Sequence, residues 1–231
     1  MSTGRRIADA DAGLTMVELI VASTVGLLLL SLMGTMFVQI TRTVSDAQLT
    51  KAATAIAWNV ADEITRVVRQ GVRVTTSSST TEGAVVAGSS PTSLIIDSNV
   101  DAAVTPGLTS IAPTRVTFTV NAAGNLIESR QASTLTSGYF AFGASTTRAV
   151  NGPISTAGTG TDALFVYWTG PNDAPVQVVP SSGGLTAAQA IQVNAVTVNV
   201  SVDVARSTGA DPVKLTNKVT MPNIAIVTGG N

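Results

Sequence analysis

The sequence predicts an α+β protein in which a long N-terminal helix, about residues 14–70, packs on an antiparallel β domain over residues 71–231. Two observations predict this fold: apolar residues keep a helical period as far as Gln70, and alternating β patterns follow Gly71. Of the 231 residues, 45% are hydrophobic and only 12% are charged. Soluble domains carry about 25% charged residues, so this chain is too apolar to be disordered.

Composition excludes several kinds of function. Lys and Arg number 13 and Asp and Glu number 14, a formal net charge of -1, so no direct nucleic-acid binding is expected. The chain contains no Cys and no His, which removes disulfides, thiolate and imidazole metal sites, and His-dependent catalytic triads. We therefore expect no enzyme, no catalytic residues, no cofactor and no metal site.

Most of the apolar excess lies in residues 14–41, which we interpret as a transmembrane half of the helix. Leu19–Thr41 contains no charged residue and is long enough to cross a hydrocarbon core of about 30 Å. Arg5 and Arg6 outnumber Arg42 on the opposite flank, so the N-terminus is expected in the cytoplasm and the β domain outside. A cleaved secretory signal is the alternative, although its apolar region is shorter, about 7–15 residues.

Glu18 interrupts the apolar run, between Val17 and Leu19. A carboxylate in hydrocarbon costs about 2.5–3.5 kcal/mol, so it is expected to have a partner. Cleavage between Gly13 and Leu14 would create an α-amino group one helical turn from Glu18. The alternative is a carboxylate at the interfacial end of the helix, neutralised by water and lipid headgroups.

The segment Gly13–Val21, followed by an apolar stretch, resembles the cleavage and methylation motif of type IV prepilins and type II secretion pseudopilins. The resemblance implies that a prepilin peptidase removes residues 1–13 as a leader by cutting after Gly13. Leu14 then becomes an N-methylated terminus, and Glu18 docks on the amine of a neighbouring subunit during assembly. The implied partners are the peptidase, other pilin or pseudopilin subunits, an inner-membrane assembly platform and, before assembly, the lipid bilayer.

Beyond Arg42 the helical period continues through an amphipathic half, residues 42–70. Its apolar residues recur at three- or four-residue steps, on the face that we expect to pack against the β domain. Gly71 follows as a stop signal. In the apolar half, Gly26 and Gly34 lie on nearly one face, which favours close helix packing. The alternative is that membrane helices simply tolerate Gly.

Short alternating segments after Gly71 predict strands. Val196, Val198 and Val200 alternate with polar residues, so one face of their strand is expected to be buried. Ser/Thr/Gly-rich segments at 75–93 and 152–162 are expected to be exposed loops. The predicted strands cover residues 115–120, 126–131, 163–168, 176–179, 196–204 and 213–221, with a hairpin turn at 121–125.

A few other residues could belong to a binding site. Asp62 and Glu63 lie next to Arg66 on the helix and are expected to form a solvated ion-paired surface. Asp97, Asp101, Asp162 and Asp173 lack the spacing of a calcium loop, so no calcium site is expected. Trp58, Tyr167 and Trp168 are expected to be packing residues and not a sugar-binding platform.

Helix, antiparallel sheet and C-terminal hairpin, in that order, resemble the pilin plan. The size of the chain and its ending Val213–Asn223 resemble the minor pilins of the W type and the J-type pseudopilins. The expected function is a structural subunit of a type IV pilus-like filament, first in the inner membrane and then outside the cell. The alternatives are a pseudopilin of a type II secretion system, or an anchored adhesin. The adhesin would bind through loops 75–93 or 143–162, where Arg148 is the only cation.

Overall fold

A computed structural model describes residues 15–101, 112–171, 173–203 and 211–224 of the chain. The chain divides into two compact units, Met1–Gln48 and Leu49–Asn231. The leader and the expected cleavage point between Gly13 and Leu14 lie outside the described residues.

Helix α1 runs from Met16 to Arg69, 54 residues, which confirms the long N-terminal helix predicted for about 14–70. It begins after Thr15, whose hydroxyl accepts a 3.3 Å hydrogen bond from the Glu18 N–H and so caps the first turn. No proline interrupts α1. Arg66 and Arg69 place positive charge in its last turn, where the helix dipole favours it.

Position 71, directly after the helix, is closely surrounded by other atoms, which favours a residue without a side chain. The Gln70 and Gly71 N–H groups bond to the Val67 and Val68 carbonyls at 3.2 and 3.0 Å, which tightens the last turn. A Cβ on Gly71 would lie 3.0 Å from the Met221 sulfur and 3.1 Å from the Val68 carbonyl. The stop signal is thus a close approach of chain segments and not a left-handed glycine cap.

In the second unit, the strands form two antiparallel four-stranded sheets and one hairpin, whereas the sequence had suggested a single sheet. The strand order is β3-β4-β5-β6 in one sheet and β10-β9-β7-β8 in the other, and β1 pairs with β2. The bounds are β1 Val74–Ser77, β2 Thr80–Glu82, β3 Ser93–Ser98, β4 Thr114–Val120, β5 Leu126–Thr136, β6 Tyr139–Asn151, β7 Phe165–Thr169, β8 Val176–Val178, β9 Ala195–Val202 and β10 Val213–Thr220. A short helix α2, Ala187–Ala190, and a 3-10 turn, Gly160–Asp162, lie in the connections.

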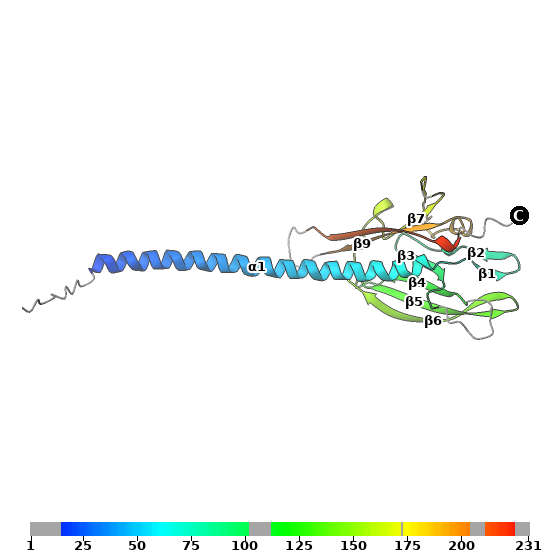
Figure 1. Ribbon diagram of the computed structural model, residues 1–231, viewed down its shortest axis with the longest axis horizontal. Helices are drawn as coiled ribbons and strands as arrows, with labels where there is room; N and C mark the ends of the chain where they lie inside the picture. The colour runs from blue at the N-terminus through cyan, green and yellow to red at the C-terminus, as the bar shows by residue number, and fades with distance from the viewer. Residues whose placement is uncertain (1–14, 102–111, 172, 204–210, 225–231) are drawn as a thin grey trace, which may run out of the picture. The chain divides into compact units, whose positions relative to one another are not determined.

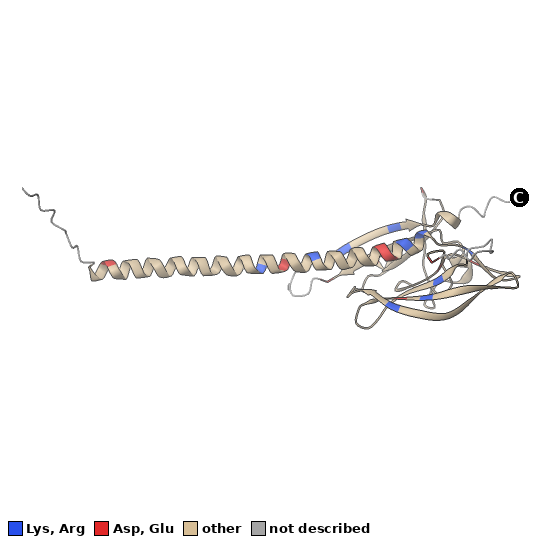
Figure 2. Ribbon diagram, turned by 60° about the horizontal axis from the view of Figure 1, so that its bottom comes forward, with Lys and Arg blue, Asp and Glu red and all other residues tan. Residues whose placement is uncertain are grey.

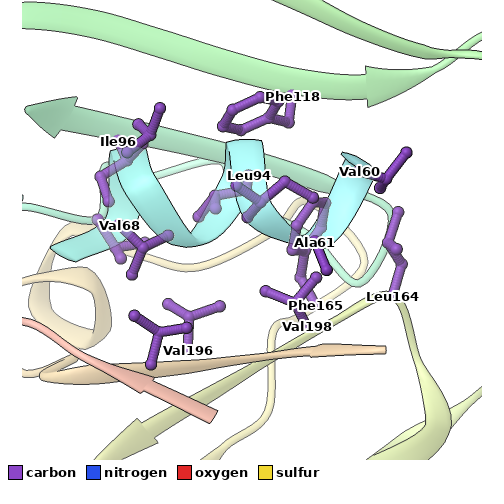
Figure 3. Close-up of a cluster of buried hydrophobic side chains, with 14 of the residues drawn as sticks. Val60, Ala61, Val68, Leu94, Ile96, Phe118, Leu164, Phe165, Val196 and Val198 are labelled. Carbon is purple, nitrogen blue, oxygen red and sulfur yellow. The ribbon is translucent and has the colours of Figure 1, made fainter. Parts of the chain in front are cut away.

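The core of the second unit lies on both sides of α1. Leu94, Ile96 and Phe118 of one sheet face the helix, while Phe165 and Val198 of the other lie on its opposite side (Figure 3). The helix contributes small and β-branched residues to this core, which lets both sheets approach it closely: Ala53, Ala57, Val60, Ala61, Ile64, Val67 and Val68 are all buried.

Six predicted strands are confirmed as β4, β5, β7, β8, β9 and β10. In the predicted hairpin turn, the Asn121 side chain accepts bonds from the Ala123 and Asn125 N–H groups at 3.0 and 2.9 Å. Gly124 has a φ of 79°, which suits glycine. Position 204, at the end of the fifth predicted strand, lies outside the described residues.

Two predicted loops are wrong in part. Residues 75–93 contain most of β1, all of β2 and the fully buried Ala84, Val85 and Ser89. Residues 143–151 belong to β6. Strand β3 had no prediction at all. The Ser/Thr-rich composition of these segments is typical of loops, but pairing with neighbouring strands outweighs that local preference.

Candidate assembly site

The first part of α1 exposes its apolar side chains. Helix α1 is long and apolar enough to cross a membrane, and none of its apolar stretch is buried in the structure. Leu28 is 70% exposed and Phe37 72%. Figure 2 shows that no charged residue lies on the helix between Glu18 and Arg42. A surface of this kind is expected to be covered by lipid or protein, because exposing so many apolar side chains to water is unfavourable.

Glu18 lies in the first turn of α1, where a negative charge meets the positive end of the helix dipole. Its carboxylate is exposed and forms no ion pair with any residue that the structure describes. The sequence Thr15-Met16-Val17-Glu18 has the Thr-x-x-Glu spacing of a capping box, and the Thr15 half of that box is present. This spacing could have identified Thr15 as the helix cap from sequence alone. Contact between Glu18 and a terminal amine stays a prediction.

Gly26 and Gly34 present open surface. A Cβ built on either residue would meet no atom within 4 Å in the structure. The surface above both glycines is therefore available to another helix, but their role in helix packing stays a prediction.

Several hydroxyl groups in and just after the apolar stretch bond back to their own helix. Ser23 donates to the Ile20 carbonyl at 2.9 Å, and Thr35 to the Leu32 carbonyl at 2.8 Å. The other bonds of this kind run from Thr24 to Ile20 and Val21, from Thr41 to Phe37 and from Thr43 to Gln39. These side chains need no partner outside the helix.

An ionic cluster joins the second half of α1 to strands β5 and β6. One Glu63 oxygen lies 2.6 Å from Arg66, 3.0 Å from Arg130 and 2.5 Å from Arg148. Glu128 is fully buried and lies 2.6 Å from Arg130 and 2.5 Å from Arg148. Asp101 also pairs with Arg130, so three acids balance three arginines. We call these six residues the Glu63 cluster.

The Glu63 cluster corrects two expectations from the sequence. Asp62 is exposed, but Glu63 is largely covered and belongs to the contact between helix and sheet. Burial alone would raise the pKa of Glu63; the Arg66 hydrogen bond and the charges of Arg66, Arg148 and Arg130 outweigh it, so the pKa is lowered. Arg148 is likewise a strand residue paired with two carboxylates, and not a free cation in a loop.

A second ionic contact lies between β2, β3 and β4. The buried Asp97 accepts bonds from Arg115 Nε and Nη2 at 2.8 and 2.9 Å, and Arg115 also pairs with Glu82. The Arg115 guanidinium lies 4.0 Å from the centre of the Phe142 ring. Burial raises the pKa of Asp97 to about 6, and the charge of Arg115 only partly offsets this effect.

The four aspartates considered for calcium do not share a site. Asp97 and Asp101 pair with different arginines. Asp162 lines a separate polar cavity of about 330 Å³ with Lys214, and Asp173 is exposed. Among the described residues, no group of three acidic side chains is placed to hold a metal ion.

The aromatic residues divide into two kinds. Tyr167 is fully buried and its hydroxyl lies 2.8 Å from the Ser90 carbonyl. Trp168 donates a 2.8 Å bond to Thr197, so packing is confirmed for these two residues. Trp58 is 59% exposed, so the expectation that it is a packing residue is not confirmed. It lines a cavity of about 310 Å³ between α1 and β10.

Compared with models of known protein families and with curated proteins, the chain matches none. The resemblance to prepilins therefore rests on the Gly13–Val21 motif and on the order of helix and sheets. It stays a prediction.

Proposed function

We propose that the protein is a structural subunit, a minor pilin or pseudopilin, of a type IV pilus-like filament. The observation that carries the proposal is the division of one continuous helix. Its first part exposes apolar side chains and a single carboxylate at Glu18, and its second part is buried between two antiparallel sheets. A helix of this kind can be held by lipid or by other helices while it presents a folded domain outside.

In the proposed assembly, the chain first spans the inner membrane with its N-terminus in the cytoplasm. A prepilin peptidase cuts after Gly13, and Leu14 carries the new amino group. Glu18 then pairs with the amine of a neighbouring subunit, because an unpaired carboxylate in hydrocarbon costs about 2.5–3.5 kcal/mol. The apolar side chains exchange lipid contacts for helix contacts on an assembly platform, and Gly26 and Gly34 allow those helices to approach closely.

The adhesin alternative has less support. Its binding loops were expected at 75–93 and 143–162, but much of both segments is strand or core. Arg148, the cation that favoured it, is paired with Glu63 and Glu128. A pseudopilin of a type II secretion system has the same anchor and the same processing, so it remains within the proposal.

Mass spectrometry of the N-terminus, on protein from the native host, tests the proposal. We expect the mature chain to begin with N-methylated Leu14. A Gly13→Leu variant is expected to keep its leader and still enter the membrane, because the apolar run is unchanged. The matched control is Gly4→Leu, which is expected to be processed normally. An intact Met1 in the mature protein, or a cut well beyond Leu14, would contradict the proposal.

A further inference from the structure

The cavity of about 310 Å³ between α1 and β10 has no role in the proposed function. Its wall on the β10 side is Leu215–Asn217. Asn217 donates a 2.9 Å bond to the Thr65 hydroxyl, which fixes the strand to the helix at this point. The residues on the α1 side follow one another at steps of four, three and four positions, so they share one face of the helix: Trp58, Asp62, Thr65 and Arg69.

Trp58 is the unusual residue of this cavity. Its side chain is 59% exposed, although burial of a large aromatic side chain is favourable. Asp62 lies one helical turn beyond Trp58 on the same face. An indole ring beside a carboxylate is an arrangement that binds organic cations, because the ring face attracts the positive charge and the carboxylate pairs with it.

The two charged side chains of the cavity, Asp62 and Arg69, have no partner among the residues that the structure describes. Both are exposed, and neither side chain forms an ion pair or a hydrogen bond there. Their helix neighbours Glu63 and Arg66, by contrast, pair with each other at 2.6 Å. An acid and a cation that line one cavity without meeting suit a ligand with opposite charges at its two ends.

The spacing of the two charges sets the length of such a ligand. Seven residues separate Asp62 from Arg69, a rise of about 10.5 Å along the helix. The long Arg69 side chain can reach back toward Asp62, because helix side chains lean toward the N-terminus. An ammonium and a carboxylate roughly 7–8 Å apart can therefore contact both. Ala61 and Leu215 also line the cavity and offer apolar contacts to a methylene chain.

We infer that the cavity between α1 and β10 binds a molecule with an ammonium at one end of a flexible chain and a carboxylate at the other. The ammonium lies beside Trp58 and Asp62, and the carboxylate pairs with Arg69. Lysine has this chemistry, either as the free amino acid or as the last residue of a polypeptide. The cavity volume of about 310 Å³ is at the lower end of the range for small-molecule sites, which suits a ligand of this size.

Other ligand classes match the cavity less well. An anion alone leaves Asp62 unmatched, and a polyamine leaves Arg69 unmatched. Trp58 is the only aromatic residue among the described residues that line the cavity, so no second ring is placed to hold a sugar or a base between two faces. The inference does not depend on the proposed function, because it uses residues of the second unit only.

The two Trp residues of the chain provide the reporter for a test by nuclear magnetic resonance. Full-length protein with isotope-labelled Trp is held in detergent, and a Trp58→Phe variant identifies the Trp58 indole signal. The probe is 6-aminohexanoate, added at constant ionic strength. We expect the Trp58 signal to shift with a dissociation constant in the millimolar range, because the charged side chains are exposed. The Trp168 signal, whose indole bonds to Thr197 at 2.8 Å, is expected to stay in place.

Two variants and two modified probes locate the two ends of the ligand. In 6-aminohexanamide the carboxylate is a neutral amide, and in 6-acetamidohexanoate the ammonium is one, so each is expected to bind about fivefold more weakly. Asp62→Asn should weaken 6-aminohexanoate about fivefold and leave 6-acetamidohexanoate unchanged. Arg69→Gln should weaken it equally and leave 6-aminohexanamide unchanged. The matched controls are Asp173→Asn and Arg42→Gln, which change exposed residues outside the cavity.

Free lysine and Nα-acetyl-lysine distinguish the two sources of the ligand. Acetylation removes the α-ammonium as a peptide bond does, so tighter binding of Nα-acetyl-lysine assigns the site to a polypeptide end, and tighter binding of lysine assigns it to the free amino acid. A Trp58 signal that does not move, equal shifts of both indole signals, or unchanged affinity in Asp62→Asn would overturn the inference. None of these outcomes bears on leader removal, which tests the proposed function separately.

Discussion

Glu18 and Glu128 are two carboxylates of one chain that differ in burial and in ion pairing. Glu128 is fully buried, and Arg130 and Arg148 lie within 2.6 Å of it. Glu18 is exposed on an apolar helix and forms no ion pair with a described residue. The positive helix end stabilises its charge by at most about 1 kcal/mol at an exposed site, less than the cost of placing it in hydrocarbon. Under the proposed function, its partner comes from another chain.

We therefore expect Glu18→Val to be inserted and processed normally but to enter filaments at least tenfold less than the native chain. Loss of a pairing worth about 1.4 kcal/mol is enough for a tenfold change. Immunoblots of filament and membrane fractions measure the ratio. The control is Thr24→Val, which removes a hydroxyl bonded to its own helix. Normal incorporation of Glu18→Val would refute the docking role.

Sequence reasoning found Glu18 because one charge in an apolar run is conspicuous. It could not find the Glu63 cluster, because Glu63 and Arg148 are 85 positions apart and meet only where α1 packs against strand β6. The helical neighbour Arg66 was visible from sequence, and so Glu63 was interpreted as a solvated surface residue. Long-range contacts of this kind leave no local pattern.

At the level of elements, prediction succeeded where apolar and polar residues alternate along a strand, although the polar face of β9 is more covered than the alternation suggests, with Thr197 buried. Val196, Val198 and Val200 of β9 are buried, as their alternation indicates. Strand β6 gives no such signal, because residues on both of its faces are exposed. Strand β3 buries Asp97 and Ser98 beside its apolar residues, which breaks the alternation. Helix α1 was the easiest element, because its period persists over many turns.

The contact between strands β2, β3 and β4 makes stability depend on pH. The pKa of Asp97 is about 6 in the folded chain, against an ordinary value of 3.8, so folding favours the protonated form. The contribution of Asp97 to stability is therefore largest at low pH and falls as the pH rises toward and through 6. Between pH 5 and pH 7 we expect a loss of about 1 kcal/mol from this residue.

Urea unfolding of the full chain in detergent at pH 5, 6 and 7 measures this loss. Asp97→Asn cannot titrate and is expected to flatten the dependence. Glu63 acts in the opposite direction, since its lowered pKa adds stability that is lost as the pH falls below about 4.5, outside this window. Stability that rises from pH 5 to pH 7, or an unchanged slope in Asp97→Asn, would contradict the assignment.

On the scale of the whole chain, the division into two units separates the exposed apolar part of α1 from the folded core. The buried hydrophobic residues that the structure describes begin at Ala53, in the second unit. The described residues of Met1–Gln48 contribute none of them. The folded core should therefore not depend on the apolar half of α1.

A chain that begins at Leu49 is expected to be soluble without detergent. Its free energy of unfolding should lie within about 1 kcal/mol of the full chain in detergent, since the cut costs about one helix cap. Urea unfolding followed by circular dichroism measures both. Removal of residues 1–60 is the control, because it also deletes the buried Ala53, Ala57 and Val60 and should prevent folding. Aggregation of the chain that begins at Leu49 would show that the two units depend on each other.

The hydroxyls of Ser23, Thr24, Thr35 and Thr41 have one further consequence. Each donates to a carbonyl of its own helix, so its hydrogen-bond partner stays the same in lipid, in detergent or among other helices. Moving this stretch from one apolar medium to another leaves these hydrogen bonds intact. For these four residues the free energy of that move then depends on van der Waals packing and not on hydrogen bonding.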